Sequence, residues 1–527
     1  MNVADVVATH ARLMPDKLAA RDSRRSLTFR EWNERADRLA NGLCSLGLSK
    51  GDRVALLAYN CVEWMEMYVA LARAGLIAVP VDFRLAGPEI QYIAETCQAR
   101  AFIVQQDLVD SVDAIRGPLG IPPERWVHFG SGPAPAGWSS YETLIAREFN
   151  AMPAVDVGTD DVWALMFTSG TTGHPKAAIR THGATAVMSL VTAIDMAFTP
   201  DDTALLVMPM CHANSLYFSF AFAHLGACCV INDSGDFDPE NVLKILSSEG
   251  VTFTSLVPSH YIAILGLPQE TKQAYDVTRV NKLMVSSAPA RRNTKLAIME
   301  YFSNSELYEL YGSTEAGWVT LLRPGEQLTK LGSIGREWTG SGAIKLLDPH
   351  GDEVPVGEIG ELFSRTPYAF DGYWQDPEKT AEAFRGAWSS QGDLACRDED
   401  GYFWLAGRKS NMIICSGSNI YPAEVENVLG GHPAVRDIGV FGVPDDRSGE
   451  TVCAVVVRHS GSVATEQEIL DWCKGRLAEY KLPRSIVFMD ESDMPRTATG
   501  KIQHHLLRAR WTTQGWGVAP GTLLDAP

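Results

Sequence analysis

The stretch 168–176 combines hydroxyl groups, glycines and a lysine in the way that a phosphate-binding loop requires. Glycines let backbone N–H groups turn toward an anion, hydroxyl side chains donate to its oxygens, and a lysine adds a mobile positive charge. The residues are Thr168, Ser169, Gly170, Thr171, Thr172, Gly173 and Lys176. The apolar run Val162–Phe167 predicts a buried strand that leads into this loop. The alternative is a solvated turn, and a Walker A loop is excluded because Pro175 stands where its second glycine should fall.

A second group of polar side chains follows a predicted strand over residues 306–310. It consists of Tyr311, Gly312, Ser313, Thr314 and Glu315. An aromatic ring, a glycine and a hydroxyl–carboxylate pair at the C-terminal end of a strand suit the ligand sites of open α/β sheets. The alternative is a glycine-containing turn with an exposed glutamate.

Three further charged residues could serve a nucleotide. Asp393 and Arg408 each follow a glycine; a carboxylate can accept from both ribose hydroxyls, and a guanidinium can hold ribose or phosphate. Lys501 ends the run Pro495–Lys501, before a predicted helix over 501–510. A desolvated ammonium can lower the repulsion when a carboxylate attacks a phosphate. The alternatives are two ordinary turns and a surface lysine at a helix start, where the helix dipole disfavours it.

The elements around these residues alternate between apolar strands and helices. Strands over 53–58 and 76–81 flank a helix, which makes a βαβ unit. The pattern recurs and predicts an α/β fold, with a large N-terminal domain (1–410) of several subdomains and mostly parallel sheets. A β-rich subdomain is expected over about 332–410, and residues 411–527 should form a small, mobile α+β C-terminal domain.

Several helix starts can be predicted from capping residues. Thr28 with Glu31, and Thr465 with Glu468, have the spacing of a capping box. Asn60 is expected to cap the helix that ends at residue 74.

Composition limits the class of protein. The chain has 527 residues, 46% of them hydrophobic and 21% charged, which predicts a soluble protein of several domains. A net charge of −18 argues against a nucleic-acid or anionic-membrane partner. The ten cysteines show no C-x-x-C pair and no metal-ligand spacing, so a reducing, cytoplasmic compartment is expected. No apolar run reaches the roughly 20 residues that span a bilayer, so no membrane span is expected.

The four motifs, in their order from Thr168 to Lys501, resemble those of the adenylate-forming enzymes. This superfamily comprises acyl- and aryl-CoA synthetases, peptide synthetase adenylation domains and luciferase. The resemblance covers nearly the whole chain and is strongest to acyl-CoA synthetases. It implies that a carboxylic acid, ATP and Mg²⁺ form an acyl-adenylate with release of pyrophosphate, and that coenzyme A then displaces AMP.

The resemblance also implies roles for the nucleotide-binding residues. Tyr311 would stack on adenine, and Thr314 would reach the α-phosphate. Glu315 would hold Mg²⁺ together with Thr168. The adenine and acyl pockets would be walled by Ser287, Ala288 and Pro289, and the ribose would be held by Asp393 and Arg408.

Lys501 and the loop after the hinge would act in different half-reactions. The resemblance implies that the C-terminal domain rotates about Asn411. One orientation brings Lys501 for adenylation, and the other brings the loop of Ser416 and Gly417 to line a pantetheine channel. Ser416 replaces a glycine of the family pattern, which leaves the CoA step open. The alternatives are an adenylation-only enzyme, of the amino-acid or luciferase type, and a catalytically silent nucleotide-binding protein.

The acid site is the least defined part. His212 lies in the segment that gates the carboxylate site in the family, although a buried histidine with satisfied hydrogen bonds is the alternative. Trp318 should narrow the acyl pocket, so a compact aromatic, alicyclic or medium-chain acid is expected. A homodimer is one candidate assembly.

Overall fold

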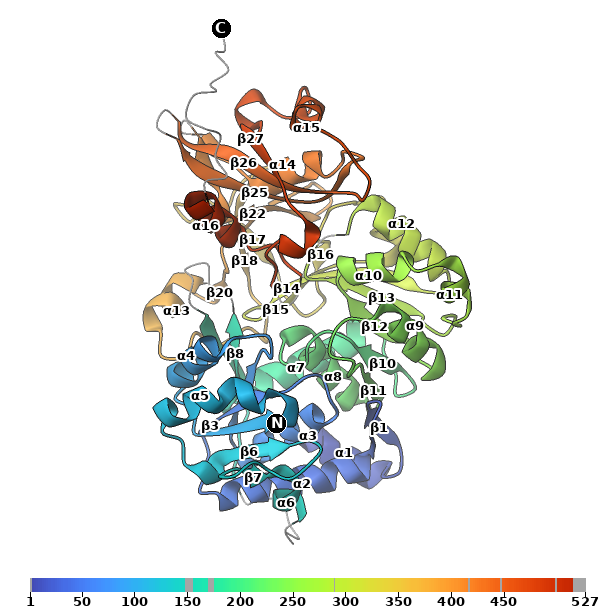
Figure 1. Cartoon of the computed structure of the whole chain (residues 1–527), viewed down its shortest axis with the longest axis vertical. Helices are drawn as coiled ribbons and strands as arrows, with labels where there is room; N and C mark the ends of the chain where they lie inside the picture. Colours follow the sequence, from blue (N-terminus) through green and yellow to red (C-terminus); the bar gives the residue numbers. More distant parts are fainter. Residues whose placement is uncertain are drawn as a thin grey trace. The chain divides into compact units, whose positions relative to one another are not determined.

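The computed structural model describes residues 2–146, 155–168, 175–288, 290–415, 418–445, 448–497 and 500–514. The chain packs into two compact units (Figure 1): Met1–Ile344 with Ser364–Ser389, and Lys345–Phe363 with Ser390–Pro527. The predicted domain boundary at residue 411 stays a prediction. That boundary is defined by a hinge, and the compactness of the two units does not locate a hinge.

A seven-stranded sheet forms the first half of the first unit. Its order is β7-β6-β5-β3-β4-β8-β9, and its neighbours are parallel except β8 and β9. Its strands are β3 (Arg53–Leu57), β4 (Ile77–Val81), β5 (Ala101–Gln105), β6 (Trp126–Phe129), β7 (Ser139–Ser140), β8 (Val162–Thr168) and β9 (Lys176–Thr181). The predicted strands over 53–58 and 76–81 are confirmed as the parallel pair β3 and β4.

A nine-stranded sheet forms the second half of this unit. Its order is β16-β15-β14-β13-β12-β10-β11-β1-β2, parallel from β14 to β1 and antiparallel at both edges. Its strands are β1 (Leu18–Arg21), β2 (Ser26–Thr28), β10 (Thr203–Leu206), β11 (Cys228–Ile231), β12 (Phe253–Leu256), β13 (Lys282–Ser286), β14 (Glu306–Ser313), β15 (Gly317–Leu322) and β16 (Arg336–Glu337). The expectation of mostly parallel sheets is confirmed.

Helices cover both sheets, and Figure 1 shows α9–α12 gathered beside β12 and β13. They are α1 (Asp5–Leu13), α2 (Phe29–Ser45), α3 (Glu63–Ala74), α4 (Gly87–Cys97), α5 (Val109–Leu119), α6 (Tyr141–Ala146), α7 (His182–Asp195), α8 (Ala213–Leu225), α9 (Pro239–Ser248), α10 (Pro258–Leu265), α11 (Gln269–Gln273), α12 (Arg292–Tyr301) and α13 (Pro377–Ala383). The capping box of Thr28 and Glu31 is confirmed at α2. The prediction for Asn60 is wrong, because α3 begins after Val62 and Asn60 Oδ1 instead accepts the N–H of Met210 at 2.8 Å.

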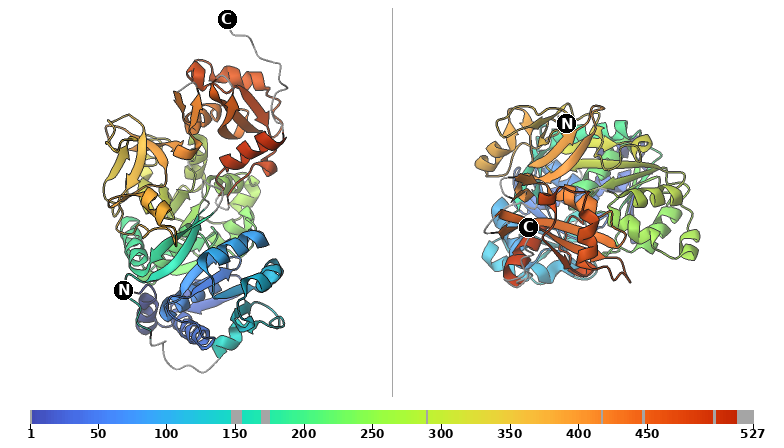
Figure 2. Two further views of the ribbon diagram at one scale, coloured as in Figure 1. Left: turned by 90° about the vertical axis from the view of Figure 1, so that its left-hand side faces the viewer. Right: turned by 90° about the horizontal axis from the view of Figure 1, so that it is seen from above.

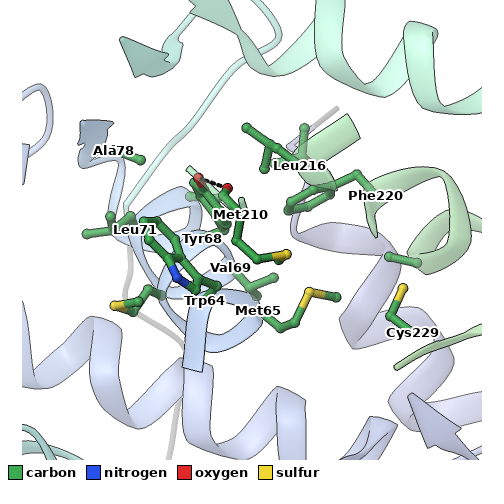
Figure 3. Close-up of a cluster of buried hydrophobic side chains, with 14 of the residues drawn as sticks. Trp64, Met65, Tyr68, Val69, Leu71, Ala78, Met210, Leu216, Phe220 and Cys229 are labelled. Atoms are coloured by element: carbon green, nitrogen blue, oxygen red, sulfur yellow. Dashed lines mark hydrogen bonds between the residues drawn. The ribbon is translucent and has the colours of Figure 1, made fainter. Parts of the chain in front are cut away.

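Helix α3 lies wholly inside the first unit, and each of its residues is buried. Tyr68 near its centre donates its hydroxyl proton to the Met210 carbonyl at 3.0 Å (Figure 3). Its ring centroid lies 5.4 Å from that of Trp64 and 5.5 Å from that of Trp163. Side chains from both sheets belong to this one core, so a shared hydrophobic cluster joins the two halves of the unit.

The second unit contains a β-rich part and a C-terminal domain. In the β-rich part, β21 (Asp393–Arg397) pairs with β22 (Phe403–Arg408) and β18 (Gly360–Ser364), and β17 (Ile344–Leu347) pairs with β18. The domain sheet has the order β24-β23-β26-β25 with β27 beside β26, and Figure 2 shows it in orange with helices around it. Its elements are β23 (Ile413–Cys415), β24 (Ser418–Ile420), α14 (Pro422–Leu429), β25 (Val435–Asp445), β26 (Gly449–Arg458), α15 (Glu466–Cys473), β27 (Ser485–Phe488) and α16 (His504–Gln514). The hairpin of β19 (Phe384–Arg385) and β20 (Trp388–Ser389) belongs to the first unit.

One helix boundary in the C-terminal domain changes the interpretation of Lys501. The capping box of Thr465 and Glu468 is confirmed at α15. However, α16 begins at His504 and not at residue 501. Lys501 therefore lies in a loop, and the expectation that the helix dipole disfavours it does not apply.

No helix of the described residues is long and apolar enough to cross a membrane. The apolar run 215–231 forms most of α8 together with β11. Gly226 ends the helix with φ 68°, a conformation that suits glycine.

Buried His182 makes the stability of the first unit depend on pH. It is the first residue of α7, it is fully buried, and its Nδ1 accepts the backbone N–H of Val3 at 3.4 Å. Burial lowers the pKa of His182 to about 4. Between about pH 6.5 and about pH 4 the unfolded chain binds a proton here that the folded protein does not bind. The stabilisation is therefore complete above about pH 6.5 and is lost as the pH falls toward 4.

We expect His182→Asn to remove up to about 3 kcal/mol of this acid-induced loss of stability. Scanning calorimetry should show that the Tm of the variant falls less steeply between pH 6.5 and pH 4 than that of the wild type. Exposed His459 provides the control, and His459→Asn should keep the wild-type slope. Equal slopes for all three proteins would contradict the prediction.

Candidate active site

The predicted phosphate loop joins two neighbouring strands. β8 ends at Thr168 and β9 begins at Lys176, and the two residues lie opposite each other in the antiparallel ladder. The Thr168 hydroxyl donates to the Lys176 carbonyl at 3.4 Å and closes the base of the loop. The buried strand over 162–167 is confirmed. The remaining predicted residues of the loop lie outside the described part of the chain: Ser169, Gly170, Thr171, Thr172 and Gly173.

Glu315 occupies the turn between β14 and β15, and only 7% of it is exposed. Its Oε1 accepts the hydroxyl proton of Tyr373 at 3.0 Å. At Gly312 a Cβ would lie 2.3 Å from the Gly317 carbonyl oxygen, so a larger residue does not fit. An exposed glutamate in a solvated turn is therefore excluded.

Lys176 and Glu315 meet at Tyr373, which the motifs do not reveal. The Lys176 ammonium lies 4.2 Å from the centroid of the Tyr373 ring, a cation–π contact, while the hydroxyl of the same ring binds Glu315. Burial lowers the pKa of Lys176, and the Glu315 carboxylate opposes that shift. The structure thus brings the predicted phosphate lysine and the predicted metal carboxylate together from segments far apart in the sequence.

Two neighbouring parallel strands end at the residues predicted to contact adenine. β13 leads into Ser287 and Ala288, and the adjacent β14 carries Tyr311 near its end. Ser287 has φ 70°, a strained conformation for a residue with a side chain, and strain of this kind concentrates at functional sites. The N–H of Ala288 donates to the Ser286 carbonyl at 2.9 Å. Pro289 lies outside the described residues.

Hydrogen bonds to its main chain hold the turn after β14. The Ser313 hydroxyl oxygen accepts the N–H of Ala316 at 2.9 Å. The carbonyl oxygens of Thr314 and Glu315 accept from the guanidinium of Arg180 at 3.4 and 3.1 Å. Arg180 lies on β9, is fully buried, and is a second residue that the motifs do not reveal.

His212 precedes α8 and has a polar partner that follows β4. Its Nε2 lies 3.3 Å from Oδ2 of Asp82. Burial raises the pKa of Asp82, but hydrogen bonds from His212 and Arg84 outweigh burial and hold that pKa well below its ordinary value. Cys211 completes a cluster that could bind a cation, yet the Arg84 guanidinium 2.9 Å from Asp82 disfavours one, and we assign no metal there. The contact with Asp82 orients the His212 ring.

Helix α8 also carries a buried amide, Asn214, that lies outside the predicted motifs. The Asn214 Nδ2 donates to the hydroxyls of Ser255 at 2.9 Å and Ser286 at 3.0 Å, at the ends of β12 and β13. Trp318 is 5% exposed, and its ring centroid lies 5.4 Å from that of Phe218 on the same helix. Polar and aromatic contacts therefore join α8 to three strands of the nine-stranded sheet.

In the second unit, the predicted ribose-binding pair is brought together by strand pairing. Asp393 and Arg408 lie opposite each other on β21 and β22, with Arg408 Nε 3.1 Å from Asp393 Oδ1. Asp393 is buried. Ser416 and Gly417, the predicted CoA residues, lie outside the described residues.

Lys501 lies at the end of a closed loop of the second unit. The N–H of Thr497 donates to the Lys501 carbonyl at 2.8 Å, and the N–H of Lys501 donates to the Thr497 hydroxyl at 3.1 Å. Arg496 anchors this loop, because its Nη1 donates to the Gly500 carbonyl at 2.8 Å and its Nη2 pairs with Asp437 on β25. Lys501 itself is exposed.

The residues of the first unit fit a magnesium–triphosphate group chemically. Mg²⁺ prefers oxygen ligands, and the buried Glu315 carboxylate and the Thr168 hydroxyl are of that kind. The Lys176 ammonium, held on the Tyr373 ring, supplies positive charge for phosphate oxygens.

Comparison with known proteins decides the family. The model of AMP-binding enzymes matches residues 7–374, and the model of the AMP-binding enzyme C-terminal domain matches residues 424–501. The chain belongs to the AMP-binding enzyme family. The resemblance to adenylate-forming enzymes is thereby confirmed.

Relatives within this AMP-binding enzyme family match the chain over almost its whole length. An indoleacetate–CoA ligase from Aromatoleum aromaticum is 33% identical over 507 residues, which cover 95% of this chain and 97% of the relative. A feruloyl-CoA synthase from Amycolatopsis sp. is 37% identical over 502 residues, with the same coverage of 95% and 97%. The ATP-bound crystal structure of MatB from Rhodopseudomonas palustris has a TM-score of 0.85 at 30% identity, over 98% of this chain and all of that one. The anthranilate CoA ligase AuaEII with anthranoyl-AMP has a TM-score of 0.87 at 29% identity, over 97% of both chains.

In this AMP-binding enzyme, Tyr373 and Arg180 contact the predicted site but belong to none of the predicted motifs. Only weak local features of the chain mark them. Tyr373 follows Gly372, which has φ 123° and whose Cβ would lie 2.7 Å from Thr380, a sign of close packing. Arg180 is a charged residue in the otherwise apolar run that follows Lys176. Neither signal indicates a nucleotide site by itself.

Proposed function

We infer that this chain is an ATP-dependent carboxylic acid–CoA ligase that releases pyrophosphate and AMP. In the first step a carboxylate oxygen attacks the α-phosphorus of ATP, and the bond to pyrophosphate breaks. In the second, the CoA sulfur attacks the acyl carbon of the adenylate and AMP leaves. Family membership supports this reaction class, and the single observation that carries it here is the cluster of half-buried Lys176 with buried Tyr373 and Glu315.

We propose that the first unit holds the nucleotide through groups of both sheets. Lys176 neutralises phosphate oxygens, Thr314 binds the α-phosphate, and Tyr311 stacks on adenine. Glu315 and Thr168 would hold Mg²⁺, which when bound offsets the negative charge of the phosphates. Adenine and acyl groups are proposed to lie against Ser287, Ala288 and Pro289, and phosphate oxygens against the loop of Ser169, Gly170, Thr171, Thr172 and Gly173. The turn that carries Thr314 and Glu315 is closed by Gly312 and Ser313.

We propose that the second unit supplies the ribose, lysine and CoA contacts. Asp393 and Arg408 are assigned to ribose, and their pairing on β21 and β22 supports a common task. Lys501 is assigned to adenylation, and Ser416 with Gly417 to pantetheine. Movement of residues 411–527 between the half-reactions remains a proposal that rests on the family resemblance.

We propose a compact aromatic, alicyclic or medium-chain acid as the substrate. Buried Trp318, packed against α8, supports a short acyl site, and His212 is proposed to gate it. Relatives named for indoleacetate, ferulate and anthranilate support an aromatic acid. Another relative, 33% identical, is named a long-chain-fatty-acid–CoA ligase, so a substrate panel must include long chains.

Acid-dependent exchange of pyrophosphate into ATP tests this function. We expect exchange with at least one compact acid of a panel that also contains long-chain acids and amino acids, and a thioester by mass spectrometry once CoA is added. ATP binding without exchange for any acid would contradict the proposal and favour a silent nucleotide-binding protein. Exchange without a thioester would favour an adenylation-only enzyme, for which Ser416 in place of a glycine is the specific reason.

A further inference from the structure

Arg180 is a fully buried cation that makes no ion pair within the described part of the chain. Its Nη1 donates to the carbonyl oxygens of Thr314 at 3.4 Å and Glu315 at 3.1 Å, and its Nη2 donates to the Tyr368 carbonyl at 2.7 Å. The carbon of its guanidinium lies 5.4 Å from the centroid of the Tyr217 ring. The side chain therefore binds main-chain dipoles and a ring, where a buried arginine usually faces a carboxylate.

Arg73 in the same unit shows the usual arrangement. It is 3% exposed, and its Nη1 lies 2.6 Å from a carboxylate oxygen of Asp37. Burial raises the pKa of the nearby Asp371 carboxyl and the charge of Arg180 opposes that shift, but the two side chains make no ion pair. The Nε of Arg180 has no hydrogen-bond partner among the described residues. Because burying a charge without a counter-ion is costly, its presence beside Glu315 indicates that the charge itself is used.

Strand β9 connects Arg180 to the lysine of the phosphate loop. Side chains alternate along a strand, so Lys176, Ala178 and Arg180 point to the same face. Lys176 contacts the ring of Tyr373, whose hydroxyl binds the Glu315 carboxylate, while Arg180 binds the main chain of Glu315. One strand thus carries both the ammonium assigned to phosphate and a guanidinium that binds the main chain of Glu315, whose carboxylate is assigned to the metal.

We propose that Arg180 is a positioning residue that holds the Thr314–Glu315 turn in its magnesium- and nucleotide-binding form and places a fixed positive charge beside it. The proposal rests on the proposed function and deepens it. Arg180 acts through the main chain of the turn and touches no reacting atom. A lysine at this position would keep the charge but lose the planar fork that reaches three carbonyl oxygens.

Two substitutions separate the effect of the positive charge from the effect of the planar guanidinium that binds three carbonyl oxygens. We expect Arg180→Lys to raise the half-saturating Mg²⁺ concentration and the KM for ATP by about 10-fold, and Arg180→Met to raise both by about 100-fold. The KM for the acid should change by less than about 2-fold, because the turn is assigned to nucleotide and metal and not to the acid. Isothermal titration calorimetry of MgATP binding, without acid, should show the same order of dissociation constants.

Arg73→Lys is the matched control, since Arg73 is also a buried arginine of the first unit. It should lower the Tm without changing the dissociation constant of MgATP. If the Arg180 variants lower the Tm but bind MgATP as tightly as the wild type, the residue is merely structural and the proposal is overturned. If Arg180→Met does not fold, Arg180→Lys alone decides: an unchanged half-saturating Mg²⁺ concentration overturns the proposal, and a rise of about 10-fold supports it.

The experiment also separates this proposal from the proposed function. If the wild type exchanges no pyrophosphate with any acid, the proposed ligase function is wrong. The calorimetric comparison of MgATP binding between the wild type and Arg180→Lys then still tests the positioning role: equal dissociation constants overturn it, and weaker binding by the variant supports it.

Discussion

Lys501→Ala should slow acyl-adenylate formation by at least about 100-fold, the loss expected for one preorganised charge. The attack of a carboxylate on a phosphate brings two anions together, and an ammonium between them stabilises the charge that builds in the transition state. The loop that carries Lys501 is closed on itself and tied to β25 through Arg496. Alanine removes the ammonium without altering these main-chain contacts, so the folded domain should persist.

Separate assays of the two half-reactions test whether Lys501 acts only in adenylation. Rapid-quench measurement of pyrophosphate release follows the first, and thioester formation from a pre-made acyl-adenylate and CoA follows the second. We expect Lys501→Ala to spare the second. Lys474→Ala is the matched control, since Lys474 is an exposed lysine of the same domain whose Nζ pairs with Asp471 at 2.6 Å. An equal loss in both half-reactions would rule out a role confined to adenylation.

Glu315→Gln should lower the rate of acid-dependent exchange by about 100- to 1,000-fold and raise the half-saturating Mg²⁺ concentration. The amide keeps an oxygen that can accept the Tyr373 hydroxyl proton, now bound at 3.0 Å, so the turn should stay folded. What disappears is the negative charge that a hard cation requires. Tyr373→Phe removes the hydrogen bond but leaves the charge, and should cost only about 10-fold.

Exchange rates measured across a Mg²⁺ titration check this prediction. Glu249→Gln is the control, because Glu249 is a carboxylate of the same unit that pairs with Arg21 at 2.7 Å and has no assigned role. It should leave both the rate and the Mg²⁺ dependence unchanged. A Glu315→Gln protein with wild-type Mg²⁺ dependence would show that the metal is held elsewhere.

Local features of the fold could be predicted because they depend on neighbouring residues. The capping boxes at Thr28 and Thr465 and the strand β8 all lie where the sequence indicates. A capping box satisfies backbone groups within one helical turn, and an apolar run is buried whatever lies beyond it. Asn60 does not cap α3, because its side-chain oxygen instead accepts a hydrogen bond from the backbone N–H of Met210 in a distant segment.

The assembly of the site could be predicted only in part. Thr168 and Lys176 flank one loop, so their proximity follows from the chain itself. Glu315 is recognisable from its motif, but its burial and its bond to Tyr373 depend on a segment that follows much later. The same holds for His212, whose partner Asp82 comes from another strand.

The sequence by itself determined which reactive groups this protein has, in which order they come, and what kind of strand or loop carries each. Those properties follow from backbone preferences and apolar periodicity, which act over a few residues. Only the tertiary structure decided that Tyr373 joins Lys176 to Glu315 and that Arg180 lies buried under the same turn. The physical reason is that side chains distant in the sequence meet where whole sheets pack, and that packing depends on the apolar surface buried across the entire core.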